Sequence, residues 1–279
     1  DVTIVFQHPQ VMSGERIYPE EIKTPEEYLI YLKEVFIYTW CKEKISQDDC
    51  CLDAGCGEGY GTKLLSSAVK KIVGIDIDKK IIRKASKKYS GNNCAYQLYD
   101  GKTIPFADNY FEVIVSFHAI EHIKNDIGFI DEMYRVLKNN GWLIISTPNK
   151  AIRLPENIPS WNVFHIREYT SAELKRLLAK RFKKVNILGI GAIPEVKKIE
   201  EERIRKNLKI TSYDFLNLRR AFPAPFTSFF IKMFRFIKNH KKNNALGLID
   251  KTYKNPSAVY KIEELNFENA LDILAVCKK

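Results

Sequence analysis

Residues 50–62 read Cys-Cys-Leu-Asp-Ala-Gly-Cys-Gly-Glu-Gly-Tyr-Gly-Thr. An apolar run leads into Asp53, and every second residue from 55 to 61 is then glycine, ahead of a helical pattern. This order predicts a buried strand, a glycine-rich turn and the start of a helix. Glycine accepts positive φ and lets the backbone come close to a ligand, and the N–H groups at the helix start face the same ligand. The stretch therefore predicts a ligand-binding turn at the carboxyl end of a strand.

Two acids further along the chain follow the same logic. The run Lys71–Asp78 predicts a short buried strand that ends at Asp76. In a doubly wound sheet, an acid at that place accepts hydrogen bonds from both ribose hydroxyls. Asp100 and Gly101 stand before the expected strand 111–117, where an acid can accept from an exocyclic adenine amine. Together these features predict a ligand that contains adenosine.

These three motifs, in this order, resemble class I S-adenosylmethionine-dependent methyltransferases over residues 45–190 and in a last strand near 270–277. The resemblance implies S-adenosyl-L-methionine as cofactor and S-adenosyl-L-homocysteine as product. It places Asp53 and the glycines near the methionine part, Asp76 on the ribose and Asp100 on adenine. The full set that it implies at the cofactor is Asp53, Ala54, Gly55, Cys56, Gly57, Gly59, Asp76, Ile77, Asp100, Gly101, Ser116, Phe117, Arg16 and Tyr18.

Two other interpretations of the glycine turn remain open, a nicotinamide dinucleotide site and a turn that binds nothing. The alternating glycines depart from the G-x-G-x-x-G spacing of dinucleotide sites. Glu58 would also face a pyrophosphate with like charge. Both observations favour the methyltransferase interpretation.

Strands that alternate with helices along the chain predict an α/β fold with a parallel sheet. We expect a Rossmann-like, seven-stranded, mostly parallel sheet with helices on both faces and an antiparallel last strand. Asn139-Asn140-Gly141 is expected to end a helix over about 125–138. The expected divisions are an N-terminal lid and helical segment (1–45), the cofactor-binding core (46–190), a helical cap (191–268) and the final core strand (269–279).

The expected cap carries most of the chain's positive charge. Residues 191–260 hold 15 Lys and Arg against 6 Asp and Glu, a net +9 of the chain's +11. Within it, residues 222–238 predict an aromatic, basic amphipathic helix. This helix could pack on the core or on a second subunit of a homodimer, or contact a membrane surface or a lipid-linked substrate. Nucleic acid is not favoured, because base stacking needs dispersed exposed rings.

The segment after the fourth strand is the best candidate for chemistry. His118-Ala-Ile-Glu-His122 has the H-x-x-E-H string of a zinc protease, but it follows a strand rather than lying within a long helix. Three interpretations stay open: loop ordering, a divalent-metal site made by His118, Glu121, His122 and His165, and general-base catalysis by His118 or His165. Because a sulfonium already activates its methyl group, the expected reaction needs no metal. His165 is expected in a partly exposed loop at the acceptor site.

Further segments refine the resemblance. Ser13–Glu20, Ser116–Ile123, Thr147–Asn149 and Phe164–Thr170 resemble methyltransferases of bacterial glycan and antibiotic-sugar biosynthesis. The implied reaction is O-methylation of a sugar or sugar-phosphate in a small-molecule or glycan acceptor, free or lipid-linked. The alternatives are N-methylation of an amino sugar, metal-assisted RNA 2′-O-methylation and a noncatalytic cofactor-binding protein.

The N-terminal segment allows two arrangements. Arg16 and Tyr18 are expected either to fold over the cofactor or to form a solvated tail. No segment resembles a signal peptide or approaches the ~18 apolar residues of a spanning helix, so a cytoplasmic protein is expected, with the membrane contact through 222–238 as its alternative.

Overall fold

The computed structural model of the chain describes residues 17–154, 160, 162, 164–212, 254–264 and 267–279. The strands are β1 (Cys50–Ala54), β2 (Lys71–Asp76), β3 (Cys94–Leu98), β4 (Phe111–Phe117), β5 (Leu137–Pro148), β6 (Lys184–Ala192), β7 (Tyr260–Glu263) and β8 (Asp272–Lys278). The α-helices are α1 (Pro25–Lys42), α2 (Tyr60–Leu65), α3 (Lys79–Tyr89), α4 (Asp126–Val136), α5 (Lys150–Arg153), α6 (Ser171–Leu178), α7 (Pro194–Ser212) and α11 (Pro256–Val259). Short 3-10 turns are η1 (Pro19–Glu21), η2 (Ser66–Ala68), η3 (Ile120–His122) and η5 (Phe267–Asn269).

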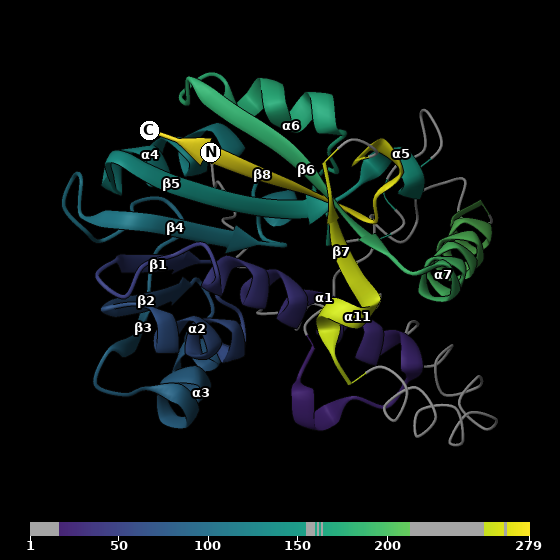
Figure 1. Cartoon of the computed structure of the whole chain (residues 1–279), viewed down its shortest axis with the longest axis horizontal. Coiled ribbons are helices and arrows are strands. Elements are labelled where there is room, and N and C mark those ends of the chain that lie inside the picture. The colour runs from purple at the N-terminus through teal and green to yellow at the C-terminus, as the bar shows by residue number, and fades with distance from the viewer. Residues whose placement is uncertain (1–16, 155–159, 161, 163, 213–253, 265–266) are drawn as a thin grey trace, which may run out of the picture.

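The described strands form one eight-stranded sheet in the order β3-β2-β1-β4-β5-β8-β6-β7 (Figure 1). Strands β1 to β5 pair in parallel, and β8 runs antiparallel between β5 and β6. The order reverses between β1 and β4. Open sheets of this kind bind ligands at such a reversal, beyond the carboxyl ends of the strands. The fold therefore points to the segments that follow β1 and β4.

Helices cover both faces of the sheet, and the central strands are buried on both sides. Cys51 and Val113 belong to the core that α1, α2 and α3 complete on one face. Leu52 and Ile114, their neighbours in sequence, belong to the core beneath α4 and α6 on the other. This alternation follows from the period of two in a strand. Figure 1 shows α6 above the sheet and α2 and α3 below it.

The expected end of the fourth helix was wrong. Helix α4 ends at Val136, and β5 begins at Leu137, opposite Phe111. The extra residues form an irregularity in the β4–β5 pairing, where Asn140 has a φ of 66°. A Cβ on Gly141 would lie 2.8 Å from the Glu112 carbonyl oxygen, so this glycine permits close packing of two strands instead of capping a helix.

The sheet has one strand more than expected. Residues 260–263, assigned from the sequence to the cap, form β7 and pair antiparallel with β6 at the edge of the sheet. This strand has only four residues, two of which (Lys261 and Glu263) are charged, so it gives little strand signal in the sequence. The pairing with β6 therefore became apparent only from the structure.

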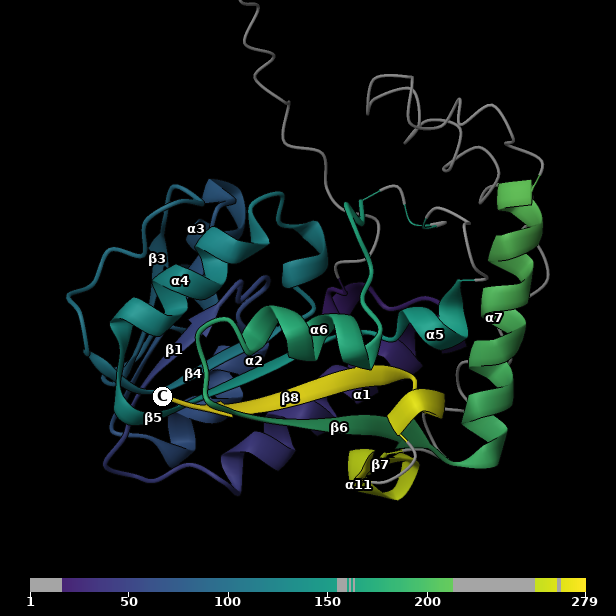
Figure 2. The ribbon, with the colours of Figure 1, turned by 90° about the horizontal axis from the view of Figure 1, so that it is seen from above.

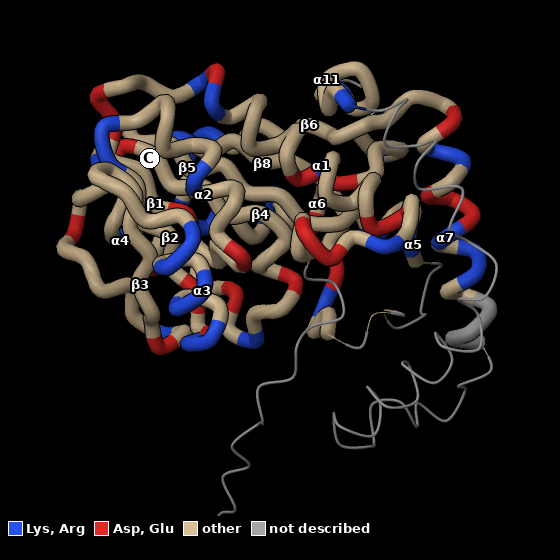
Figure 3. Tube along the Cα trace, turned by 90° about the horizontal axis from the view of Figure 1, so that it is seen from below, with Lys and Arg blue, Asp and Glu red and all other residues tan. Residues whose placement is uncertain are grey.

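Only part of the expected cap lies within the described residues. Helix α7 stands beyond the carboxyl ends of the strands, in line with the arrowhead of β5 (Figures 1 and 2). Residues 194–212 hold six Lys and Arg and four Asp and Glu. Figure 3 accordingly shows both colours of charge on α7. The aromatic segment 222–238 lies outside the described residues, as does most of the net charge. No helix within the described residues is long and apolar enough to cross a membrane.

Candidate functional site

The glycine turn after β1 lies against the end of β2. The backbone N–H groups of Gly55 and Cys56 both donate to the carbonyl of Ile75, at 2.8 and 3.0 Å. Gly55, Gly57 and Gly59 have φ values of 84°, 49° and 81°, the left-handed region that glycine adopts without strain. The predicted turn therefore has the backbone conformation that its sequence indicated.

The three glycines face different surroundings. A Cβ on Gly55 would lie 2.7 Å from Ala119, and one on Gly59 would lie 2.6 Å from the ring of Tyr96. A Cβ on Gly57 would meet no atom within 4 Å. Gly55 and Gly59 thus allow the turn to pack against the protein, whereas Gly57 presents bare backbone to open space. This is the position at which a ligand can approach the main chain.

Asp53 supports the turn from beneath. It is fully buried, and its carboxylate accepts hydrogen bonds from Thr62 Oγ1 at 2.6 Å and from the Tyr38 hydroxyl at 3.1 Å. Burial raises the pKa of Asp53 to about 7, and the two hydrogen bonds oppose that rise. Its neighbours Ala54 and Cys56 are also buried. The acid therefore ties α1 and α2 to the end of β1.

Asp76 lies opposite the turn, as its place after β2 predicts. Its Oδ2 accepts from the N–H of Gly57 at 3.1 Å, and its Oδ1 accepts from the N–H of Asp78 at 2.9 Å. Beside it, Ile77 is 61% exposed although it is apolar. A Cβ on Gly101 would lie 3.3 Å from Ile77, so these two residues face each other closely. The pair offers an apolar seat for a flat ring next to the acid.

Asp100 is exposed, and its Oδ1 accepts from the N–H groups of Lys102 and Thr103, both at 2.8 Å. These backbone bonds hold its pKa below the usual value. Asp100 is therefore an ionised acid fixed at the carboxyl end of β3. Together with Asp76 and Gly57 it lies on the edge of the sheet to which the sequence assigned the cofactor.

The other expected cofactor residues have structural contacts. Ser116 Oγ donates to the Ala54 carbonyl at 2.8 Å, and the Phe117 ring packs edge-on against Tyr38. Tyr18 lies beneath the ammonium of Lys84 on α3, 4.7 Å from ring centre to nitrogen. Arg16 lies outside the described residues. The role of these residues at the cofactor stays a prediction.

The segment after β4 touches the glycine turn through Ala119 and carries a buried polar network. His118 has a φ of 49°, which is uncommon for a residue with a side chain. Its Nε2 lies 3.1 Å from Asp272, the first residue of β8, and Asp272 also pairs with Lys33 of α1 at 2.8 Å. Burial disfavours the charged imidazole, but Asp272 and Glu121 outweigh it and raise the pKa of His118 to about 10. A protonated His118 is suited to donate hydrogen bonds and not to act as a general base.

Glu121, His122 and His165 form a second cluster beside it. One side-chain ligand atom from each lies within 4.8 Å of the other two. His165 is only 1% exposed, so the expected partly exposed loop was wrong at this residue. Its Nδ1 lies 2.8 Å from Glu168, and this carboxylate fixes the ring in the interior. The structure thus unites three of the four predicted metal candidates, and places His118 with Asp272 instead.

Two participants could not be anticipated from the sequence. Lys33 and Asp272 are 239 positions apart, and both are buried at the carboxyl end of the sheet next to His118. Asp272 begins an apolar strand and has the local pattern of an ordinary surface charge. Lys33 falls on the buried face of α1, four residues from Leu29 and from Ile37, but the spacing does not show which acid it meets.

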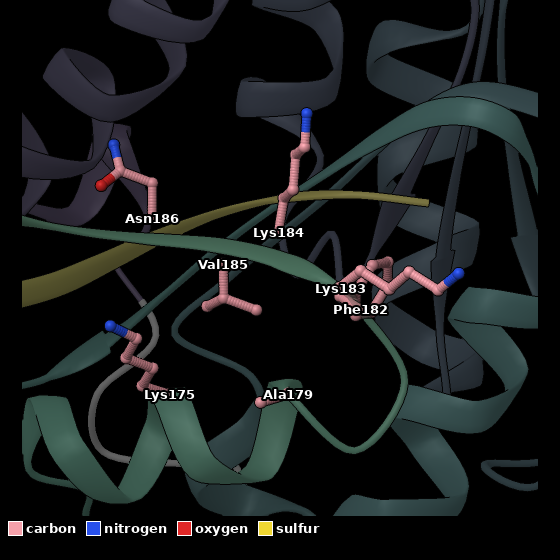
Figure 4. Close-up of a pocket in the computed structure, with 7 residues that line it drawn as sticks. All are labelled: Lys175, Ala179, Phe182, Lys183, Lys184, Val185 and Asn186. Atoms are coloured by element: carbon pink, nitrogen blue, oxygen red, sulfur yellow. The ribbon is translucent and has the colours of Figure 1, made fainter.

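A surface hollow in the described part of the chain lies elsewhere. It has a volume of about 420 Å³ and lies between α6 and β6, at the end of the sheet where β6 begins. Figure 4 shows its lining residues, among them Lys175, Ala179 and Val185. No residue of the glycine turn or of the histidine cluster lines it. This hollow is therefore separate from the candidate functional site.

Comparison with known proteins agrees with the geometry at the carboxyl end of the sheet. Residues 52–145 match a methyltransferase domain family. A protein of Mycolicibacterium smegmatis named "Probable S-adenosylmethionine-dependent methyltransferase" is 30% identical over 167 residues, which are 60% of this chain and 63% of that protein. A protein of Mycobacterium tuberculosis with the same description is 33% identical over 127 residues, 46% of each chain.

A solved structure shares the fold. It is an S-adenosylmethionine-dependent methyltransferase of Thermotoga maritima, with a TM-score of 0.54 at 12% identity, covering 91% of this chain and 94% of that one. The expected Rossmann-like methyltransferase fold is confirmed, and the domain match supports the resemblance to class I methyltransferases. The relatives also support S-adenosylmethionine as the cofactor that the sequence predicted.

Proposed function

We propose that this chain is an S-adenosylmethionine-dependent methyltransferase that methylates a hydroxyl of a sugar or sugar-phosphate, free or within a glycan. The single observation that carries the proposal is the arrangement at the carboxyl ends of β1 and β4. There, bare backbone at Gly57 lies next to Asp76, and the polar segment 118–122 touches the same turn through Ala119. A cofactor seat and a set of acid–base groups are thus neighbours.

The described residues fit the parts of the cofactor. Asp76 and Asp100 present carboxylates for ribose hydroxyls and an adenine amine, and the exposed apolar side chain of Ile77 beside Gly101 can lie against one face of the ring. When bound, S-adenosylmethionine supplies an electrophilic methyl carbon on a cationic sulfur. The protein then has to align the acceptor oxygen with that carbon, exclude water and receive the hydroxyl proton.

The acceptor is assigned to the side of Glu121, His122 and His165. Glu121 and His122 directly follow β4, and His165 lies in the segment before α6 that is hydrogen-bonded to Glu121. Together they place a carboxylate and two imidazoles in a largely buried site. Such groups can bind a hydroxyl and draw away its proton, whereas the protonated His118 is suited to hold the acceptor by donating to it. The sugar character of the acceptor rests on the resemblance of segments 13–20, 116–123, 147–149 and 164–170.

Two measurements test the proposal. Calorimetry should show binding of S-adenosylmethionine and S-adenosylhomocysteine and none of nicotinamide dinucleotides. A screen of sugars, sugar phosphates, amino sugars and RNA, read by mass spectrometry, should give a methyl-sized gain on a hydroxyl-bearing sugar. If neither sulfur nucleoside binds, the proposal fails; if both bind and no acceptor is methylated, the chain is a noncatalytic binding protein.

The role of His165 has its own test. His165→Ala should lower turnover by ~10²–10⁴-fold while cofactor affinity stays unchanged, because the residue serves the acceptor and not the nucleoside. A variant with near-normal turnover would assign His165 to packing alone.

A further inference from the structure

Glu121, His122 and His165 come together from two separate segments of the chain. Glu121 and His122 belong to η3, directly after β4, and His165 belongs to the segment that precedes α6. The two imidazole rings are 4.9 Å apart between centroids and nearly perpendicular. The N–H groups of Ile166 and Arg167 donate to the carbonyl of Glu121 at 2.9 and 3.3 Å. Backbone hydrogen bonds thus hold the two segments in a fixed relation.

Each of the three side chains has a partner that orients it from behind. His122 Nδ1 lies 3.0 Å from the Phe164 carbonyl, and His165 Nδ1 lies 2.8 Å from Glu168. Glu121 Oε2 accepts from Thr147 Oγ1 at 3.0 Å. Histidines that ligate metals almost always give one ring nitrogen to a carbonyl or carboxylate in this way, which directs the other nitrogen at the ion.

Glu168, the partner of His165, has contacts of its own that hold it in place. Glu168 accepts from Ser160 Oγ at 2.5 Å, and Arg153 Nε lies 3.2 Å from its other oxygen. These contacts hold the Glu168 carboxylate in place against His165 Nδ1.

The carboxylate of Glu121 is incompletely satisfied. Its side chain is 1% exposed, and Oε1 has no hydrogen-bond partner. His118 Nδ1 lies 3.6 Å away, which makes it an ion-pair partner but is beyond hydrogen-bond distance. The oxygen therefore keeps a lone pair that a cation could use. A carboxylate oxygen of Glu121 and one ring nitrogen of each imidazole lie within 4.8 Å of one another.

We propose that Glu121, His122 and His165 bind one divalent transition-metal cation. Two imidazoles and one carboxylate suit Zn²⁺, Mn²⁺, Fe²⁺ or Co²⁺, while Mg²⁺ and Ca²⁺ prefer oxygen ligands. Three protein ligands leave positions open on the ion, where an acceptor hydroxyl can coordinate and release its proton more readily. This use in methyl transfer rests on the proposed function, whereas the metal site itself does not.

The test measures metal binding in the absence of cofactor and acceptor. The full chain is stripped with chelator and titrated with Co²⁺ and Mn²⁺, followed by absorption spectroscopy and calorimetry. We expect one equivalent to bind, with a Co²⁺ spectrum of nitrogen and oxygen ligands and no thiolate charge-transfer band. The absence of the thiolate band distinguishes this site from binding to any of the six cysteines.

Variants locate the site. Glu121→Gln and His165→Gln should abolish stoichiometric binding, and Glu168→Gln, which only orients His165, should weaken it by ~10–100-fold. Glu132→Gln is the matched control, because Glu132 pairs with Arg135 on α4 and is not part of the cluster. It should keep the affinity of the parent chain. Binding of S-adenosylhomocysteine, measured on every variant, reports whether the chain is folded.

Three outcomes would overturn the proposal: no binding of either ion by the parent chain, a thiolate spectrum, or equal affinity in the parent and in both ligand variants. If a ligand variant does not fold, Glu168→Gln decides between a metal site and none. Metal binding without any cofactor binding would refute the proposed function and leave the metal site standing.

Discussion

Replacing Gly57 by alanine should separate cofactor binding from folding. Gly57 lies in the left-handed region at a φ of 49°, where an L-residue costs about 1–2 kcal/mol, partly offset by about 0.4–1 kcal/mol from a less flexible unfolded chain. The new methyl group would meet no atom within 4 Å, so no steric cost is added. We expect the free energy of unfolding to fall by about 1 kcal/mol.

The effect on the cofactor should be larger. If S-adenosylmethionine lies against this backbone, the methyl group occupies space that the ligand needs, and overpacking of that kind costs about 1–3 kcal/mol. The dissociation constant measured by calorimetry should then rise roughly 5- to 150-fold. Gly91→Ala is the matched control, because its Cβ would lie 3.8 Å from Lys63 and its φ is ordinary. An affinity of Gly57→Ala within twofold of the parent, with folding intact, would refute the placement of the cofactor on this turn.

Three further substitutions test the packing around the site. Asp53→Asn removes a carboxyl whose pKa is raised to about 7, so its stabilising contribution is complete below pH 4 and is lost as pH rises through 7. Between pH 5 and pH 8 the free energy of unfolding of the parent chain should therefore fall by about 2–3 kcal/mol more than that of the variant, as measured by denaturation. An equal fall in both chains would contradict the raised pKa. Lys33→Met leaves buried Asp272 with one partner fewer and should lower the free energy of unfolding by about 3 kcal/mol. Adding Asp272→Asn should restore part of that free energy, and no recovery in the double variant would show that the loss is not electrostatic. Gly61→Ala would drive a Cβ into the ring of Tyr38 and should lower the melting temperature by more than Gly57→Ala does; a melting temperature equal to the parent's would disprove this close packing.

Local patterns were sufficient for much of the fold. The expected strands over 50–53, 71–76 and 111–117 correspond to β1, β2 and β4, because each contains a short stretch without charged or polar side chains (50–52, 72–75 and 113–115) that a polar residue follows. The Thr170–Glu173 capping box opens α6 with both reciprocal hydrogen bonds in place. Signals of this kind depend on neighbours within a few residues, so they can be recognised from the sequence alone.

The failures share a different cause. Asn139-Asn140-Gly141 has the composition of a helix cap, yet the pairing of β5 with β4 determines its conformation. His165 has the polar neighbours Arg167 and Glu168, which suggested an exposed loop. The structure buries it because Glu168 turns inward to the imidazole and to Arg153. In both cases long-range contacts outweigh the local preference.

The sequence by itself determined the glycine turn, the acids that follow the second and third strands, and the alternation that makes a parallel sheet. These features are set by backbone conformation and by the period of each element, both of which are local properties. Only the tertiary structure decided which polar side chains meet. Lys33, His118 and Asp272 come from a helix, a loop and the last strand, and Glu121 meets His165 from another segment. Burial makes such charges adopt partners that lie far away in the chain, and no spacing in the sequence records those partners.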